Sequence, residues 1–239
     1  MRIAIIMLLI GLVLSNGFAQ RSAKIQNADE ILAKVVKGFK EVKDFSSTID
    51  AEINMDRVQI PKMHAELFFK KPDKVHFSSQ SFLLVPREGI ALNPLVLQEH
   101  YLATSAVHDT VDGKRLFKLF LAAKDVKTRL RALSVWIDPI NWTIGKIETI
   151  PYEGRTLIMI FYYECQQKKY WLPSKLIVSM ASESDKAQKD SSLSSSPSMD
   201  NQFESYQRPA PRNGTVTVVY SNYKINIGLS DEIFEKKEK

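Results

Sequence analysis

The sequence predicts an α+β fold: a curved, incomplete antiparallel β-barrel of about ten strands, covered by helices and enclosing an apolar cavity. Apolar residues first recur at helical spacing, at Ile31, Val35 and Phe39, and after Asp44 the period changes to two. The strand-like segments follow one another across short turns, which favours an antiparallel meander. A sheet of this kind that curls without closing leaves a concave apolar face for helices to cover.

One helix is expected near the start of the chain. Asn27 can cap its N-terminus, and Glu30 follows at the spacing of a capping box. Asp29 and Glu30 lie in the first turn, where the helix dipole favours negative charge. The apolar stripe continues to Val42, and lysines cover the other side. The helix should therefore lie on an apolar surface, either as ordinary core packing or as a helix that lines or plugs a cavity.

The first strands are expected from alternation of apolar and polar side chains. Residues 49–55 and 63–70 alternate in this way. Pro72 cannot donate to a sheet ladder, so it separates the second of them from a short strand containing Val75 and Phe77.

Later strands are separated by turn residues, of which Asp112-Gly113 predicts a tight hairpin. The strands are expected at 107–111, 115–121, 130–137, 143–150, 156–163, 176–180, 215–220 and 223–227. The segment 156–163 is apolar on both faces, so both of its faces should be covered.

Two segments are less regular. Residues 81–100 are apolar but interrupted by proline and glycine, which predicts a loop with one short helix near Leu95–Tyr101, either a lid over a cavity or a loop with an apolar underside. Residues 182–214 are serine-rich and polar, which predicts a mobile insertion. We expect residues 20–239 to form one domain.

The N-terminus has the pattern of a secretory signal peptide over residues 1–19. Arg2 precedes the apolar run 3–14, and Gly17 and Ala19 place small residues at a cleavage site. Cleavage after Ala19 predicts an exported, soluble protein, the alternative being an uncleaved anchor helix. The cysteine Cys165 lies far from this site, so we expect no lipid anchor, and its apolar neighbours predict a buried, inert thiol.

The search for catalytic and metal-binding motifs is mostly negative. The histidines His64, His76, His100 and His108 do not stand at zinc-site spacing, although a metal pair of His64 and His76 is conceivable. Nucleophile elbows, metalloprotease motifs and phosphate loops are absent from the sequence. We therefore expect no enzyme, no metal and no cofactor. The net charge of +6 is dispersed along the chain, so nucleic acid is not an expected partner.

Five features, in their order along the chain, resemble the LolA family of outer-membrane lipoprotein carriers, in the wider group that includes LolB and RseB. They are the signal peptide, the helix opening with Ala-Asp-Glu-Ile-Leu at 28–32, Leu-Phe-Phe-Lys-Lys-Pro-Asp-Lys-Val at 67–75, Val-Trp-Ile-Asp-Pro at 135–139, and Tyr-Lys-Ile-Asn-Ile-Gly-Leu at 223–229 with Ile233-Phe234. The resemblance covers the chain from its signal peptide to its last strand, apart from the serine-rich insertion.

The resemblance implies a monomeric periplasmic carrier that holds the acyl chains of lipoproteins, or lipids, on the way to the outer membrane. Its partners would be an inner-membrane exporter and an outer-membrane acceptor. The alternative is an RseB-like regulatory module that senses lipoproteins and contacts a membrane partner. In the family, an arginine before the proline hydrogen-bonds the backbone of a lid. Here that position is Lys71, the candidate for a lid latch, which lacks the planar fork of arginine.

Strand alternation predicts which side chains face the cavity, although a slip of one residue would swap the faces of a strand. The predicted acyl-binding residues are Leu67, Phe69, Val75, Phe77, Val135, Ile137, Leu157, Met159, Phe161, Leu176 and Val178.

Overall fold

The computed structural model describes residues 27–55, 58–79, 93–126, 128, 130–152, 156–181 and 214–235. Its elements are α2 (Ala28–Phe39), β1 (Asp44–Met55), β2 (Val58–Gln59), β3 (Met63–Lys70), β4 (Lys74–Phe77), α4 (Pro94–His100), β5 (Tyr101–Val111), β6 (Lys114–Ala123), β7 (Leu130–Ile137), β8 (Ile144–Pro151), β9 (Thr156–Gln166), β10 (Tyr170–Ala181), β11 (Gly214–Ile225) and α6 (Glu232–Glu235). The expected signal peptide and the loop 81–92 lie outside the described residues. So does the expected insertion, except that Gly214 opens β11.

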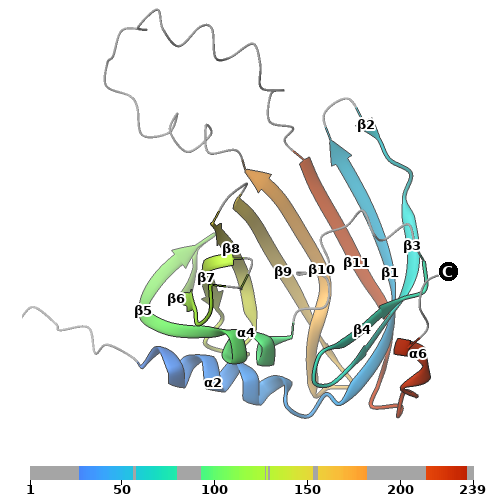
Figure 1. Ribbon diagram of the computed structural model, residues 1–239, viewed down its shortest axis with the longest axis horizontal. Coiled ribbons are helices and arrows are strands. Elements are labelled where there is room, and N and C mark those ends of the chain that lie inside the picture. Colours follow the sequence, from blue (N-terminus) through green and yellow to red (C-terminus); the bar gives the residue numbers. More distant parts are fainter. Residues whose placement is uncertain are drawn as a thin grey trace, which may run out of the picture.

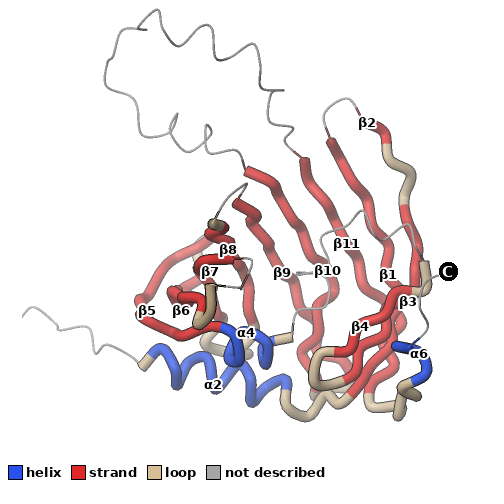
Figure 2. The backbone as a smooth tube through the Cα atoms, viewed as in Figure 1, coloured by secondary structure: helices blue, strands red, loops and turns tan. Residues whose placement is uncertain are grey.

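The described strands form one 11-stranded antiparallel sheet in the order β4-β3-β1-β11-β10-β9-β8-β7-β6-β5, with β2 paired to β1. Figure 1 shows that this sheet is strongly curved and that α2 and α4 run beneath the strands at the β5 end. Figure 2 shows how little of the described chain is helical. The ends of the path, β4 and β5, do not pair with each other. The predicted open antiparallel sheet is therefore confirmed.

One face of the sheet, called the inner face below, is apolar across neighbouring strands. Val178 of β10 pairs with Met159 of β9 and with Val216 of β11, and all three side chains are buried. The same row continues through Ile147 of β8 and Val135 of β7. Because paired residues point to the same side of a sheet, these side chains form one continuous apolar surface.

Helix α2 covers part of this inner face. The side chain of Asn27 accepts from the Asp29 N–H, so the predicted N-cap is confirmed. Ile31, Leu32 and Val35 of the helix are buried in the same apolar cluster as the inner face. The helix ends at Phe39, before the end of the apolar stripe, and Val42 is instead buried in the turn that follows.

The structure confirms the strand positions better than the strand lengths. The expected strands 215–220 and 223–227 are one strand, β11. Between the pairs Thr48–Ser221 and Ser46–Lys224, two residues of β11 stand opposite one of β1, so β11 has one extra residue there. Such a bulge interrupts the alternation of side chains while the hydrogen-bonded ladder continues. Bulges also interrupt β5 and β10, and the sequence predicts only the second half of each of these strands. The predicted hairpin is confirmed, since Asp112 and Gly113 have φ values of 49° and 76°.

The second face of β9 is less covered than the sequence predicts. Ile158 and Ile160 are half-buried, and Tyr162 is exposed on this outer face. The expectation that both faces of the segment 156–163 are buried is therefore wrong for Tyr162.

The inner face should dominate stability. Replacing the fully buried Leu176 by alanine should lower the free energy of unfolding by about 2–5 kcal/mol, because it leaves a cavity between β9 and β11. The same truncation at the exposed Val126 should change it by less than about 0.5 kcal/mol. Urea unfolding followed by circular dichroism measures both, and equal effects would contradict the assignment of the core.

Candidate functional site

The structure brings most of the predicted acyl-binding residues together on the inner face. Nine of them are buried in one cluster with α2: Leu67, Phe69, Phe77, Val135, Ile137, Met159, Phe161, Leu176 and Val178. Leu157 is half-buried near the start of β9. Val75 was expected to face the cavity but is 37% exposed, because it lies on the edge strand β4 with a neighbour on one side only. That these residues bind acyl chains stays a prediction.

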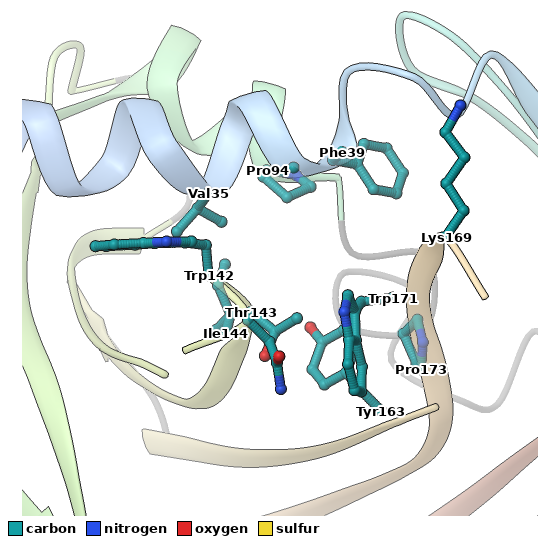
Figure 3. Close-up of a pocket in the computed structure, with 12 residues that line it drawn as sticks. Val35, Phe39, Pro94, Trp142, Thr143, Ile144, Tyr163, Lys169, Trp171 and Pro173 are labelled. Carbon is teal, nitrogen blue, oxygen red and sulfur yellow. The ribbon is translucent and has the colours of Figure 1, made fainter. Parts of the chain in front are cut away.

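A pocket of about 130 Å³ lies between α2 and the sheet. Figure 3 shows Val35 and Phe39 of the helix on one side and Trp142, Tyr163 and Trp171 on the other. Its lining residues are Val35, Gly38, Phe39, Pro94, Asn141, Trp142, Thr143, Ile144, Tyr163, Lys169, Trp171 and Pro173. Typical small-molecule sites measure about 300–1,000 Å³, so the pocket in this state admits only a small group.

None of the eleven predicted residues lines this pocket. The sequence does not predict this pocket because its walls come from α2, from the start of α4, from the β7–β8 connection, and from β9, β10 and the turn between them. No local pattern in the sequence records that these segments meet. The one available signal was the group of aromatic residues near strand ends, Trp142, Tyr170 and Trp171.

The β7–β8 connection positions Trp142. Its backbone N–H donates to the Asp138 carbonyl at 2.9 Å, and the Asp138 N–H donates to the Thr143 carbonyl at 2.9 Å. Trp142 has a φ of 54°, an unusual conformation for a residue with a side chain. Its ring stacks on Phe117 with 6.1 Å between centroids, and the Lys34 ammonium lies 4.3 Å from its centroid. The ring is therefore held from both the helix and the sheet.

The described walls of the pocket are neutral except at Lys169. Burial raises the pKa of Tyr163 well above its ordinary value, so its hydroxyl stays protonated. Burial likewise raises the pKa of Tyr223 nearby, whose hydroxyl donates to the Pro173 carbonyl at 2.7 Å. Lys169 is the charged lining residue, and it forms an exposed ion pair with Glu41 at 2.7 Å. An arrangement of rings and aliphatic groups, with the polar side chains of Asn141 and Thr143 and one cation, suits a mainly apolar ligand rather than acid–base chemistry.

Lys71 contacts the end of α2. Its Nζ donates to the Phe39 carbonyl at 3.1 Å and also to the Lys40 carbonyl. These carbonyls lie at the C-terminus of the helix, where cations are favourable. Desolvation, with repulsion from Lys40 second, lowers the pKa of Lys71 below its ordinary value. The candidate latch thus contacts the backbone of the helix that covers the pocket, and its role as a latch stays a prediction.

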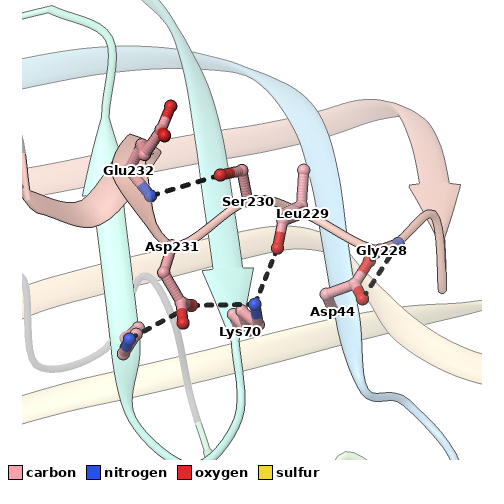
Figure 4. A network of polar contacts seen from close by, with 8 residues as sticks. Asp44, Lys70, Gly228, Leu229, Ser230, Asp231 and Glu232 are labelled. Carbon is pink, nitrogen blue, oxygen red and sulfur yellow. Dashed lines mark hydrogen bonds and ion pairs between the residues drawn. The ribbon is translucent and has the colours of Figure 1, made fainter.

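The turn that carries Lys71 (residues 70–74, the β3–β4 turn) contacts two further segments. Asn93, which caps α4 by accepting from the Leu95 N–H, also donates to the Pro72 carbonyl. Figure 4 shows Lys70 donating to the Leu229 carbonyl at 2.7 Å and pairing with Asp231 at 2.8 Å.

The C-terminal segment is fixed a second time by a buried carboxylate. Asp44 accepts from the N–H groups of Ile227 and Gly228, at 2.8 Å and 3.2 Å. Gly228 has a φ of 73°, which residues with a side chain rarely adopt. The segment after β11 is therefore anchored to both β1 and β3.

Other candidate groups do not form a site. Among the described residues there is no group of three His, Cys, Asp or Glu that could hold a metal ion. His64 instead lies 2.8 Å from Asp50 on the exposed face of the sheet. Cys165 is exposed, so the prediction of a buried thiol is wrong. It lies near the end of β9, next to the exposed Glu164. Within the same described ranges, no helix has the length and apolar character needed to cross a membrane.

Comparison with known proteins defines the fold. No protein-family model matches the sequence, and no curated protein matches it. Among solved structures, a LolA-superfamily protein from Nitrosomonas europaea is similar, with a TM-score of 0.54, 13% identity, and coverage of 87% of this chain and 97% of that one. A protein from Vibrio parahaemolyticus described as an "outer membrane lipoprotein-sorting protein domain" has a TM-score of 0.52 and 14% identity, over 87% and 97% of the two chains. A DUF1329-family protein from Desulfovibrio piger has a TM-score of 0.52 and 13% identity, over 87% and 96%. The chain has the LolA-like fold, as the sequence resemblance predicts.

Replacing Lys71 by methionine should loosen α2 while the sheet stays folded. Hydrogen bonds from a charged donor contribute about 1.5–3 kcal/mol when well shielded, and Lys71 is only partly shielded, so amide exchange in α2 should accelerate by about tenfold. Hydrogen–deuterium exchange with peptide resolution measures it.

The matched control is Lys37→Met, an exposed lysine in the last turn of the same helix. This variant should exchange like the wild-type protein. Unchanged exchange in Lys71→Met would show that these bonds do not hold the helix.

Proposed function

We propose that this protein is a periplasmic carrier that binds the acyl chains of lipoproteins, or of lipids, in an apolar cavity between α2 and the inner face of the sheet. The observation that carries the proposal is the pocket beneath α2, lined mainly by aromatic and aliphatic side chains together with Asn141, Thr143 and Lys169. It adjoins the buried inner face, and its covering helix is held at its C-terminus by the side chain of Lys71. Moving an acylated molecule between membranes would then require only its binding and release, with no covalent chemistry.

The lining of the pocket supports an apolar ligand. Each methylene that leaves water contributes about 0.8 kcal/mol, so a chain of ordinary length gains enough by burial alone to bind without charged contacts. The aromatic rings of Trp142 and Trp171 and the side chain of Val35 offer such burial, and none of the described residues that line the pocket carries a carboxylate.

The pocket must widen before it holds a whole acyl chain. A volume of about 130 Å³ is close to that of an apolar cavity that binds benzene, roughly 150 Å³. Displacement of α2 from the inner face would expose further apolar surface, including Met159 and Val178, which the sequence predicts as acyl-binding residues. We assign Lys71 the role of a latch that holds the helix when no ligand is bound.

The fold comparison is consistent with this proposal. The structure from Vibrio parahaemolyticus carries the description of a lipoprotein-sorting domain, and the one from Nitrosomonas europaea that of the LolA superfamily. One fold hosts many functions, so the proposal depends on the pocket and its test rather than on the fold. The signal-peptide pattern of residues 1–19 supports the periplasmic location.

A charge placed in the pocket should weaken acyl binding. The Trp171→Glu variant should bind an anthroyloxy-labelled palmitate at least about tenfold more weakly, because a carboxylate at the pocket wall opposes burial of the chain. Fluorescence titration of the purified protein measures the affinity.

The matched control is Tyr162→Glu. Both aromatic side chains lie on neighbouring strands and are similarly exposed, at 40% for Trp171 and 45% for Tyr162, and only Trp171 lines the pocket. Tyr162→Glu should bind the probe like the wild-type protein. Absence of probe binding by the wild-type protein, together with an apo mass in native mass spectrometry after purification without detergent, would contradict the proposed function.

A further inference from the structure

The two edges of the sheet differ in how they are protected. The β4 edge is four residues long. Lys74 on it pairs with Asp231 at 3.1 Å, and α6 packs against the strand. Short length, a lysine and a covering segment are the usual means by which proteins prevent an edge strand from pairing with another chain.

The β5 edge differs in two of these respects, its length and its lack of a lysine. It is 11 residues long, and its sequence, YLATSAVHDTV, contains no lysine or proline. Its acidic residue, Asp109, accepts a hydrogen bond from the Trp136 indole at 2.7 Å. Among the residues that the structure describes, β5 pairs with β6 only. In an antiparallel strand, alternate residues direct their N–H and C=O groups to opposite edges, so one row of these groups in β5 points away from the sheet.

An apolar strip borders this edge on the outer face of the sheet. Leu102 and Val107 of β5 are 54% and 56% exposed. Phe120 of β6 pairs with Ser105, lies on the same face as these two side chains and is also exposed. An added strand would place alternate side chains beside this strip, which favours apolar residues at every second position of the partner.

We propose that the edge of β5, above all its regular part from Ser105 to Val111, binds an extended polypeptide segment by strand addition. Only a polypeptide backbone supplies donors and acceptors at the repeat of a strand, so a lipid does not fit this edge. Apart from His108 and Asp109, the side chains from Ser105 to Val111 are short and uncharged, which allows a backbone to approach.

The position of the edge indicates which polypeptide binds. β5 begins at Tyr101, directly after α4, and both α2 and α4 pack against it. The edge therefore starts beside the helices that border the pocket. An acylated protein whose chains enter the pocket would bring its adjoining polypeptide next to β5. This step rests on the proposed function: the segment is the part of the cargo that follows its acyl anchor.

The experiment compares two probes on the full-length mature protein. One is dye-labelled palmitate, and the other is a palmitoylated ten-residue peptide of alternating valine and threonine with the same dye. The peptide conjugate should bind about tenfold more tightly than palmitate, and it alone should slow deuterium exchange in residues 105–111. The Val107→Lys variant should lose this tenfold increment and keep its affinity for palmitate, since lysine on an edge strand opposes pairing.

The matched control is Val219→Lys, at an exposed valine on the outer face of β11, which has a neighbour on both sides. This variant should keep the increment.

Equal affinity of the two probes with no protection of β5 would overturn the proposal and leave the acyl-carrier function standing. Failure of both probes to bind would instead refute the carrier function and with it the assignment of the cargo. If Val107→Lys does not fold, the exchange measurement on the wild-type protein still shows whether the peptide binds the β5 edge. Protection of β5 that rises with protein concentration alone, together with a dimer in sedimentation, would assign the edge to a second copy and overturn the proposal.

Discussion

A single open sheet has to bury an apolar face, and this constraint governs the rest of the structure. The inner face carries fully or nearly fully buried aliphatic side chains on β1, β3 and β6 to β11. Each contributes about 1.5–3 kcal/mol when it leaves water. The described residues form no second sheet on which this one could pack, so the sheet curves around its own inner face. Bulges in β1–β11, β5–β6 and β9–β10 provide points of bending. The remaining opening is where α2 and α4 lie (Figure 1).

The helices need an attachment that does not depend on the inner face alone, and the β3–β4 turn supplies it. Lys71 contacts the C-terminus of α2, the Pro72 carbonyl accepts from Asn93 at the start of α4, and Lys70 contacts the segment after β11. Three segments that are distant in sequence thus meet at five consecutive residues, 70–74. Each bond is made to a helix end or an irregular backbone, where carbonyl groups lack partners within the element. The turn therefore satisfies groups that would otherwise be solvated while it fixes the position of the cover.

Local physics explains what the sequence predicts correctly. The cap at Asn27 and the Asp112-Gly113 hairpin depend on residues a few positions apart, and both are confirmed. Alternation locates the inner face because one buried side of a strand imposes a period of two. It fails at Val75 and Cys165, which lie on an edge strand and near a strand end, where the second neighbour or the cover is missing. The pocket is not predictable in this way, since its walls are brought together only by the curvature of the sheet.

The balance between apolar and polar contacts of α2 explains how this helix can cover the inner face stably and still be displaced by a ligand. The apolar contacts of Ile31, Leu32 and Val35 are worth too much for α2 to leave the sheet and meet water, because each side chain would lose about 1.5–3 kcal/mol. Acyl chains entering beneath the helix would instead replace the inner face as its apolar neighbour, so most of these contacts would be exchanged and not lost. What remains to be broken among the described residues is then polar and small in number: the bonds from Lys71, the contact of the Lys34 ammonium with Trp142, and the exposed ion pair between Lys169 and Glu41, which solvent screens. Under the proposed function, an apolar ligand opens this cover far more easily than water does, which is the selectivity that a carrier of acyl chains requires.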